Sequence, residues 1–152
     1  AFTAKQGRNK YLPLDSSFWQ GYNIKKTKGV QIVVKLGNVF ILGDSYSTFE
    51  GSIPAGNEAW YFTKPKNNTN VTDKSQTWWY KLINNTDSAL IRNESFSGTT
   101  ICNTGYGGGY CPKTSFIGRF DRLCSEGFFK ENPVDTFFVF GGTNDSWAGS
   151  PV

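Results

Sequence analysis

The chain has 152 residues, of which 38% are hydrophobic, and this is enough for one folded domain with its own core. Its net charge of +4 comes from lysines scattered along the sequence, whereas nucleic-acid-binding domains concentrate basic residues on one face, so we expect no nucleic acid as a partner. No run approaches the roughly 18 consecutive apolar residues of a membrane span, and no signal-peptide pattern begins at Ala1, so we expect no membrane partner.

The N-terminal part of the chain differs in composition from the rest. Residues 1–29 are polar and aperiodic, so we interpret residues 1–37 as an N-terminal extension and residues 38–152 as the folded domain. The apolar, β-branched runs QIVVKL (31–36) and VFIL (39–42) are separated by a Gly-Asn pair. They predict either two strands, the first a possible edge strand in the extension, or one bent strand.

Helical and strand patterns alternate after a long polar loop over residues 47–72. A helix is predicted over residues 73–85, where Asp73 or Ser75 can cap the N-terminus and apolar residues recur at helical spacing. The run 114–124 has the same period and predicts a second helix. Further strands are predicted for ALIRN (89–93) and VDTFFVF (134–140). The order strand, helix, strand, helix, strand indicates an α/β domain with a parallel sheet and crossover helices.

The three cysteines are unevenly spaced. Cys102 and Cys111 bracket the flexible loop NTGYGGGY, and a disulfide closing this short loop would stabilise it by roughly 2–3 kcal/mol. We predict this disulfide, which would indicate an oxidising compartment; the alternative is two reduced thiols. A zinc site is disfavoured because the chain has no histidine and no further cysteine pair, so we expect no metal. Cys124 lies on an apolar stripe and is predicted to be a buried thiol.

Polar and glycine-containing segments follow three of the predicted strands. GDSYS follows the strand at 39–42, ESFSG follows the strand at 89–93, and GGTND follows the strand at 134–140. The carboxyl ends of parallel strands lie at one edge of a sheet, where ligands bind at the switch point of the strand order. These three segments are therefore expected to converge on one site.

The same three segments resemble blocks I, II and III of the SGNH (GDSL-type) hydrolases. The resemblance implies a three-layer α/β/α fold with a parallel, flavodoxin-like sheet, and a serine esterase that needs no cofactor. It implies that Ser45 is the nucleophile, and that the oxyanion hole consists of the Ser45 N–H, the Gly98 N–H and the Asn144 side-chain amide. Such donors lower the barrier because they meet the negative charge of the tetrahedral intermediate, and losing one costs about 3 kcal/mol.

The sequence departs from this family in one respect. The family takes its general base from a later D-x-x-H block, whereas this chain contains no histidine and ends shortly after block III. A serine hydroxyl without an adjacent base is a weak nucleophile. We therefore expect residues 38–148 to represent about the first two-thirds of such a domain, nearly inactive alone. The expected partner is a missing C-terminal segment or another copy of the chain.

Aromatic residues suggest the class of substrate. Aromatic side chains in an open cleft suit sugar rings, so we expect a short acyl ester or an acylated carbohydrate as substrate, with Tyr46, Phe96 and Trp147 as substrate-binding residues. The alternative is that most of these rings pack in the core. The aromatic residues in or near the expected site loops are Tyr46, Trp60, Tyr61, Phe96, Tyr106, Tyr110 and Trp147. A second hypothesis, favoured by the lack of histidine, is a secreted module that binds glycans without cleaving them.

Five N-x-S/T sequons bear on the location of the protein: Asn67, Asn70, Asn84, Asn93 and Asn144. A glycan on Asn144 would occupy the amide that the oxyanion hole requires. We therefore expect a bacterial protein that is periplasmic or secreted, where this modification does not interfere.

Overall fold

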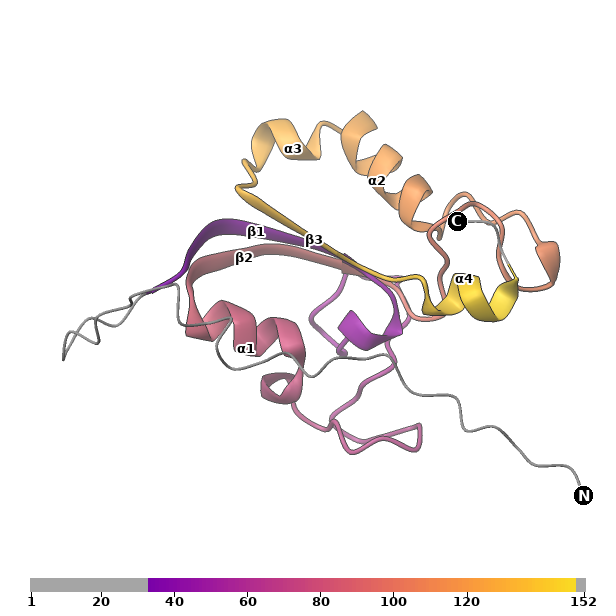
Figure 1. Ribbon diagram of the computed structural model, residues 1–152, viewed down its shortest axis with the longest axis horizontal. Coiled ribbons are helices and arrows are strands. Elements are labelled where there is room, and N and C mark those ends of the chain that lie inside the picture. Colours follow the sequence, from indigo (N-terminus) through magenta and orange to yellow (C-terminus); the bar gives the residue numbers. More distant parts are fainter. Residues whose placement is uncertain (1–32, 150–152) are drawn as a thin grey trace, which may run out of the picture. The chain divides into compact units, whose positions relative to one another are not determined.

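The computed structural model describes residues 33–149, which belong to one compact unit (Figure 1). Most of the predicted extension, residues 1–37, therefore lies outside the described residues. The strands are β1 (Lys35–Gly43), β2 (Asp87–Ser95) and β3 (Thr136–Phe140). The α-helices are α1 (Trp78–Asn85), α2 (Phe116–Ser125), α3 (Phe128–Glu131) and α4 (Thr143–Ala148), and the short 3-10 turns are η2 (Ser45–Ser47), η3 (Lys74–Gln76) and η4 (Tyr106–Gly108).

The sheet is parallel, with the strand order β2-β1-β3. Helix α1 lies on one face of the sheet, and α2 and α3 lie on the other (Figure 1). Alternate side chains of β1 point to opposite faces. Val39 and Ile41 join one buried cluster with Trp79 of α1, whereas Phe40 and Leu42 join a second cluster with Phe116 of α2. The predicted three-layer α/β/α arrangement is thus confirmed, because β1 is buried between two cores.

Strand β1 is one strand that is irregular near its start. Its register against β2 shifts between Lys35 and Gly37 and again between Val39 and Phe40. Gly37 has a φ of +65°, and a Cβ at this position would lie 2.3 Å from Asp135 Oδ2. Of the two predicted arrangements, the single bent strand is the one observed. Residues 35 and 36 of the predicted run 31–36 belong to β1, and residues 33 and 34 precede it outside any strand.

The predicted helices are present with shifted boundaries. The run 73–85 divides into η3, which Asp73 caps by accepting from the Ser75 N–H at 2.8 Å, and α1, which Thr77 caps by accepting from the Tyr80 N–H. Ser115 caps α2 and accepts from the Gly118 N–H at 3.0 Å. Strand β2 is longer than predicted, and α3 and α4 were not predicted. These two helices are too short for a hydrophobic period to reveal them.

The structure corrects the predictions for the cysteines. All three are free thiols, so the predicted disulfide between Cys102 and Cys111 is not formed in this structure. The Cys102 thiol instead donates to the Thr104 carbonyl at 3.4 Å, and the Cys111 sulfur lies 3.7 Å from Thr100 Oγ1. Backbone hydrogen bonds hold the loop closed, including the one from the Cys111 N–H to the Asn103 carbonyl at 2.8 Å. Free thiols at these positions do not indicate an oxidising compartment.

Cys124 is exposed, so its predicted burial is also wrong. Leu123, its neighbour on α2, takes the inward position with an exposed fraction of 1%. The next residue on an α-helix is turned by about 100°, and this rotation carries Cys124 off the buried face.

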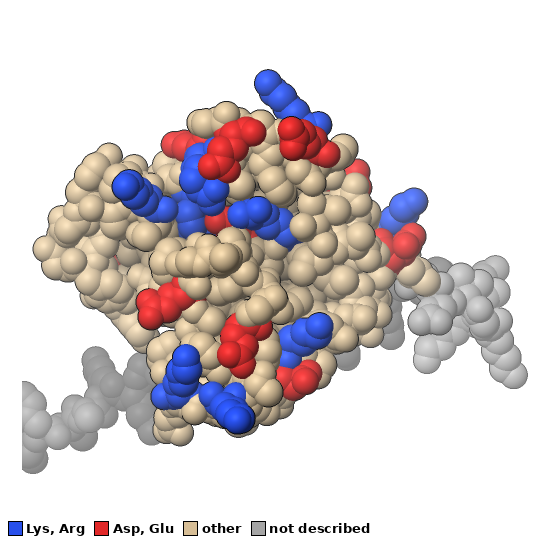
Figure 2. Space-filling model, turned by 180° about the vertical axis from the view of Figure 1, so that it is seen from behind, with Lys and Arg blue, Asp and Glu red and all other residues tan. Residues whose placement is uncertain are grey.

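Charged side chains of both signs are interspersed on the face shown in Figure 2, where Lys and Arg do not gather into one patch. Between residues 33 and 149, no helix has the length and apolar character needed to cross a membrane.

Candidate active site

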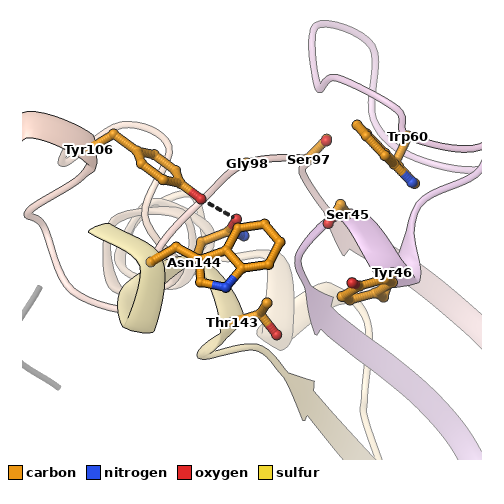
Figure 3. Close-up of a pocket in the computed structure, with 9 residues that line it drawn as sticks. Ser45, Tyr46, Trp60, Ser97, Gly98, Tyr106, Thr143 and Asn144 are labelled. Atoms are coloured by element: carbon orange, nitrogen blue, oxygen red, sulfur yellow. Dashed lines mark hydrogen bonds between the residues drawn. The ribbon is translucent and has the colours of Figure 1, made fainter. Parts of the chain in front are cut away.

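A pocket of about 260 Å³ lies at the carboxyl edge of the sheet, where the three strands end (Figure 3). Ser45, Gly98 and Asn144 all line this pocket, so the structure brings together the three residues predicted for the nucleophile and the oxyanion hole. The full lining is Ser45, Tyr46, Trp60, Ser97, Gly98, Tyr106, Thr143, Asn144 and Trp147. Each of the segments after β1, β2 and β3 contributes to it, as the parallel arrangement of the strands requires.

Ser45 is the first residue of η2, directly after β1. The Asp44 side chain caps this turn by accepting from the Tyr46 N–H at 3.1 Å, and the Ser45 carbonyl accepts from the Thr48 N–H and hydroxyl at 3.1 and 2.7 Å. Gly43 permits the close approach of this turn to β2, because a Cβ there would lie 2.5 Å from the side chains of Ser47 and Ser95. The turn thus holds a half-buried Ser45 at the edge of the pocket.

Gly98 is required by its backbone conformation. Its φ is +75°, a region that only glycine adopts readily, and its ideal Cβ position has no other atom within 4 Å. The constraint is therefore conformational, because space around the residue is open. Gly98 lines the pocket from the loop after β2.

Asn144 is buried at the start of α4, with an exposed fraction of 5%. Its Nδ2 donates to the Thr99 carbonyl at 2.9 Å, and its Oδ1 accepts from the Tyr106 hydroxyl at 2.8 Å (Figure 3). A side-chain amide has two N–H donors, of which the Thr99 carbonyl occupies one. The amide therefore has a further N–H with which to bind an oxygen in the pocket.

Asp145 fixes the loop that carries Gly98 to the start of α4. It is fully buried, and its two carboxylate oxygens accept from the Ile101 N–H at 2.9 Å, with a longer bond of 3.4 Å from the Cys102 N–H. Hydrogen bonds to a charged acceptor contribute more than neutral ones. Sequence reasoning did not identify this role, because the partners of Asp145 lie more than 40 positions away in the chain.

Arg119 ties together the segments behind the pocket. It is 1% exposed and donates to the Gly43 carbonyl and the Thr99 hydroxyl, both at 3.1 Å, and also to the Glu94 and Thr114 carbonyls. Burial lowers the pKa of Arg119 to about 10, while the nearby Glu94 and Asp44 carboxylates raise it. Arg119 therefore remains protonated at neutral pH. The sequence signal that could have revealed it is an arginine among the apolar residues of α2.

Asp44 is also fully buried, next to Ser45 in the chain. Burial raises the pKa of Asp44 above its ordinary value, although the Tyr46 N–H and the Arg119 charge act in the opposite direction and Asp145 adds to the increase. Its Oδ2 atom is buried without a hydrogen bond from the protein residues described. The carboxyl group therefore incurs a desolvation cost when it is ionised.

Four of the aromatic residues expected at the site line the pocket, and they are partly exposed: Tyr46, Trp60, Tyr106 and Trp147. Phe96 does not line it, contrary to its prediction as a substrate-binding residue. Its N–H donates to the Gly43 carbonyl at 3.1 Å and continues the pairing at the end of β2, and the next two residues turn toward the pocket instead. Tyr61 packs against the core, and Tyr110 is 78% exposed outside the lining.

Two of the five sequons are buried in the fold. Asn93 is 3% exposed, and its Nδ2 donates to the Ser47 carbonyl at 2.8 Å, while Asn144 is held as described above. Because both amides are used inside the protein, a glycan at either position would disrupt the folded structure.

Comparison with known proteins agrees with this geometry. Residues 37–152 match the family model described as GDSL-like Lipase/Acylhydrolase. Crystal structures named as GDSL-like lipases from Bacteroides ovatus and Bacteroides uniformis are similar, with 48% and 44% sequence identity and TM-scores of 0.68 and 0.67. Both similarities cover 77% of this chain and 53% and 52% of those chains, so this chain spans about half the length of these relatives.

No curated protein matches the chain. The family model covers well over half of the sequence, and the solved relatives share the α/β fold with its parallel sheet. The resemblance predicted from the segments GDSYS, ESFSG and GGTND is confirmed, and the chain belongs to the GDSL-like lipase/acylhydrolase family.

Proposed function

We propose that this chain provides the nucleophile and the oxyanion hole of a serine ester hydrolase that removes short acyl groups from carbohydrates or other small esters. The observation that carries the proposal is that Ser45, Gly98 and Asn144 line the same pocket. A turn serine, a turn glycine and a helix-start asparagine have no structural need to converge. Membership of the acylhydrolase family supports the same chemistry.

The proposed reaction begins when Ser45 Oγ attacks the carbonyl carbon of the ester. The carbonyl oxygen becomes an oxyanion, which accepts hydrogen bonds from the Ser45 and Gly98 N–H groups and from Asn144 Nδ2. Collapse of this intermediate breaks the ester C–O bond, releases the alcohol after it has gained a proton, and leaves the acyl group on Ser45. Water then attacks the acyl-enzyme and releases the acid. A general base must take the Ser45 proton in the first step and return one to the leaving alcohol.

The acid–base group is proposed to come from another polypeptide segment, because the chain contains no histidine. Strand β3 lies at the edge of the sheet and pairs with β1 on one side. Its Phe137, Val139 and Phe140 are 46%, 62% and 46% exposed, a surface suited to a further strand. The Bacteroides relatives are about twice as long as the matched region, so their remaining part is the proposed type of complement.

The pocket supports a small substrate group. Its volume of about 260 Å³ lies below the roughly 300–1,000 Å³ typical of sites for drug-sized ligands. A short acyl group fits this volume better than a long chain does. Trp147 and Trp60, which are 72% and 39% exposed at the pocket, offer flat apolar faces on which a sugar ring can stack.

The experiment mixes this chain with the part of the Bacteroides ovatus relative that it does not cover. We expect hydrolysis of p-nitrophenyl acetate and of an acetylated xylo-oligosaccharide to rise by roughly three orders of magnitude over the chain alone, the scale on which serine hydrolases depend on their base. Ser45→Ala should abolish the gain. Ser125→Ala, an exposed serine at the end of α2, is the matched control and should retain it.

Equal hydrolysis by the chain alone and by the mixture, with no effect of Ser45→Ala, would show that Ser45 is an ordinary turn serine.

The second candidate function, a module that binds glycans without cleaving them, is favoured by the lack of histidine. In that case the xylo-oligosaccharide should bind the chain while no acetate is released from it, with or without the complement.

A further inference from the structure

The glycine-rich loop between β2 and α2 brings a tyrosine to the buried amide of Asn144. Residues 104 and 110 form an antiparallel bridge, and the Gly105 N–H donates to the Gly109 carbonyl at 2.8 Å. Gly107 and Gly108 have φ values of +68° and +75°, so the tip of the loop requires glycine. This tip, η4, holds Tyr106 at the pocket wall opposite Trp60 (Figure 3).

We propose that Tyr106 is a positioning residue that strengthens the Asn144 amide as a donor in the oxyanion hole and, together with the Thr99 carbonyl, holds its orientation, a role that rests on the proposed function above. The two hydrogen bonds of the amide carry this inference. Asn144 Nδ2 donates to the Thr99 carbonyl at 2.9 Å, and the Tyr106 hydroxyl donates to Asn144 Oδ1 at 2.8 Å.

The orientation of the amide follows from the types of its partners. A backbone carbonyl can only accept, so Nδ2 must face Thr99 and Oδ1 must face Tyr106. A flipped amide would place its oxygen against the Thr99 carbonyl, and two acceptors would then face each other without a proton between them. The Tyr106 hydroxyl therefore acts as the donor, and it satisfies an oxygen that is buried with the rest of Asn144.

The same bond strengthens the donor that faces the substrate. A hydrogen bond donated to an amide oxygen draws electron density from the amide nitrogen and makes its N–H groups better donors, as in other hydrogen-bond chains. The Nδ2 proton not used by Thr99 is the one that would meet the developing oxyanion. Tyr106 is 51% exposed, so removal of its hydroxyl leaves the packed core of the domain intact.

The test compares the wild-type chain with Tyr106→Phe, which keeps the ring and removes only the hydroxyl. Tyr110→Phe is the control, because Tyr110 lies on the same loop but outside the pocket lining. In protein labelled with ¹⁵N at the asparagine side chains, the Asn144 signals are identified by their loss in Asn144→Ala. In Tyr106→Phe we expect these signals to move upfield and their protons to exchange faster with solvent, with no change in Tyr110→Phe.

The second measurement titrates the same proteins with methylphosphonate, a small tetrahedral anion that mimics the intermediate. The affinity should fall about tenfold in Tyr106→Phe, the loss expected for one neutral hydrogen bond, and should remain unchanged in Tyr110→Phe. In the mixture with the complementing polypeptide, kcat for p-nitrophenyl acetate should fall by a similar factor while KM changes little, since the contact acts mainly on the transition state.

Unmoved Asn144 signals in Tyr106→Phe, or an unchanged affinity for methylphosphonate, would overturn the role of Tyr106. Failure of the proposed function would be seen in the wild-type protein and not only in Tyr106→Phe. If the wild-type chain did not bind methylphosphonate at all, or if the mixture released no acetate, then the oxyanion-hole assignment itself would fall. The Asn144 signals would still decide, independently of catalysis, whether Tyr106 orients the amide.

Discussion

Asp44 is a buried carboxyl group beside the proposed nucleophile, and its environment contains one favourable charge and one unfavourable one. Arg119 stabilises its ionised form, whereas Asp145 and desolvation oppose that form. Desolvation is the largest of these effects, and it raises the pKa of Asp44. The turn that contains Ser45 is therefore capped by a carboxyl group that takes up a proton more readily than an exposed aspartate does.

Asp44→Asn tests this effect through the pH dependence of stability. A raised pKa means that the favourable contribution of Asp44 is complete below its ordinary pKa of 3.8 and is lost as the pH rises through the folded value. Asparagine stays neutral and still offers an oxygen to the Tyr46 N–H. The free energy of unfolding of Asp44→Asn relative to wild type should therefore increase from about pH 3.5 to about pH 7.

Urea denaturation of both proteins at the two pH values measures this difference, because the other carboxyl groups contribute equally and cancel. Asp121→Asn, at an exposed position on α2, is the control and should show a smaller change. A difference between Asp44→Asn and wild type that is the same at both pH values would contradict the assignment.

At the scale of elements, one side chain of α2 joins the ends of β1 and β2. Arg119 donates to the carbonyl of Gly43 at the end of β1 and to the carbonyl of Glu94 in β2. It also donates to the hydroxyl of Thr99, whose carbonyl accepts from Asn144. Helix α2 thus supports the site from behind, although none of its residues lines the pocket.

Arg119→Met should destabilise the domain by about 3–5 kcal/mol, because it leaves buried carbonyls without donors and removes the positive charge near Glu94. Arg119→Lys should recover only part of this loss, since an ammonium group cannot reproduce the planar set of donors. Lys130→Met, at an exposed position on α3, is the control for loss of a surface charge. The measurement is urea unfolding at neutral pH, and an Arg119→Met protein within about 1 kcal/mol of wild type would refute this role.

At the scale of the whole described unit, an apolar surface extends from the edge strand β3 onto α2. A second pocket of about 320 Å³ lies on this surface, between Val139 of β3 and Ile117 and Phe120 of α2. These three side chains are 62%, 45% and 37% exposed. Contiguous apolar surface of this kind marks sites of protein association.

We expect the isolated chain to self-associate as its concentration rises, and the complementing polypeptide to compete with this association. Val139→Lys should reduce self-association with little loss of stability, because a charged residue on an edge strand discourages further strand pairing. Thr72→Lys, at an exposed position away from β3, is the control. Sedimentation velocity over a concentration series measures the effect, and a wild-type chain that stays monomeric throughout would contradict it.

The local pattern of the sequence determined the elements and the place of the site. Short apolar runs followed by glycine and polar residues predicted β1, β2 and β3, and the parallel order placed their carboxyl ends together. This rule places the segments that contain Ser45, Gly98 and Asn144 at one edge of the sheet, because each residue lies within a few positions of a strand end, and the resemblance to the SGNH hydrolases assigned the three residues their roles. Their convergence needs only backbone topology, which the hydrophobic pattern encodes.

The tertiary structure decided which other side chains line the pocket and which ones contact Ser45, Gly98 and Asn144 or the segments that carry them. The exclusion of Phe96 from the pocket, the free thiols of Cys102 and Cys111, and the burial of Arg119 all depend on contacts between distant segments. The bond between Tyr106 and Asn144 joins residues 38 positions apart. Such contacts depend on side-chain direction and on the register of packed elements, and a local pattern of residue types carries no information about either.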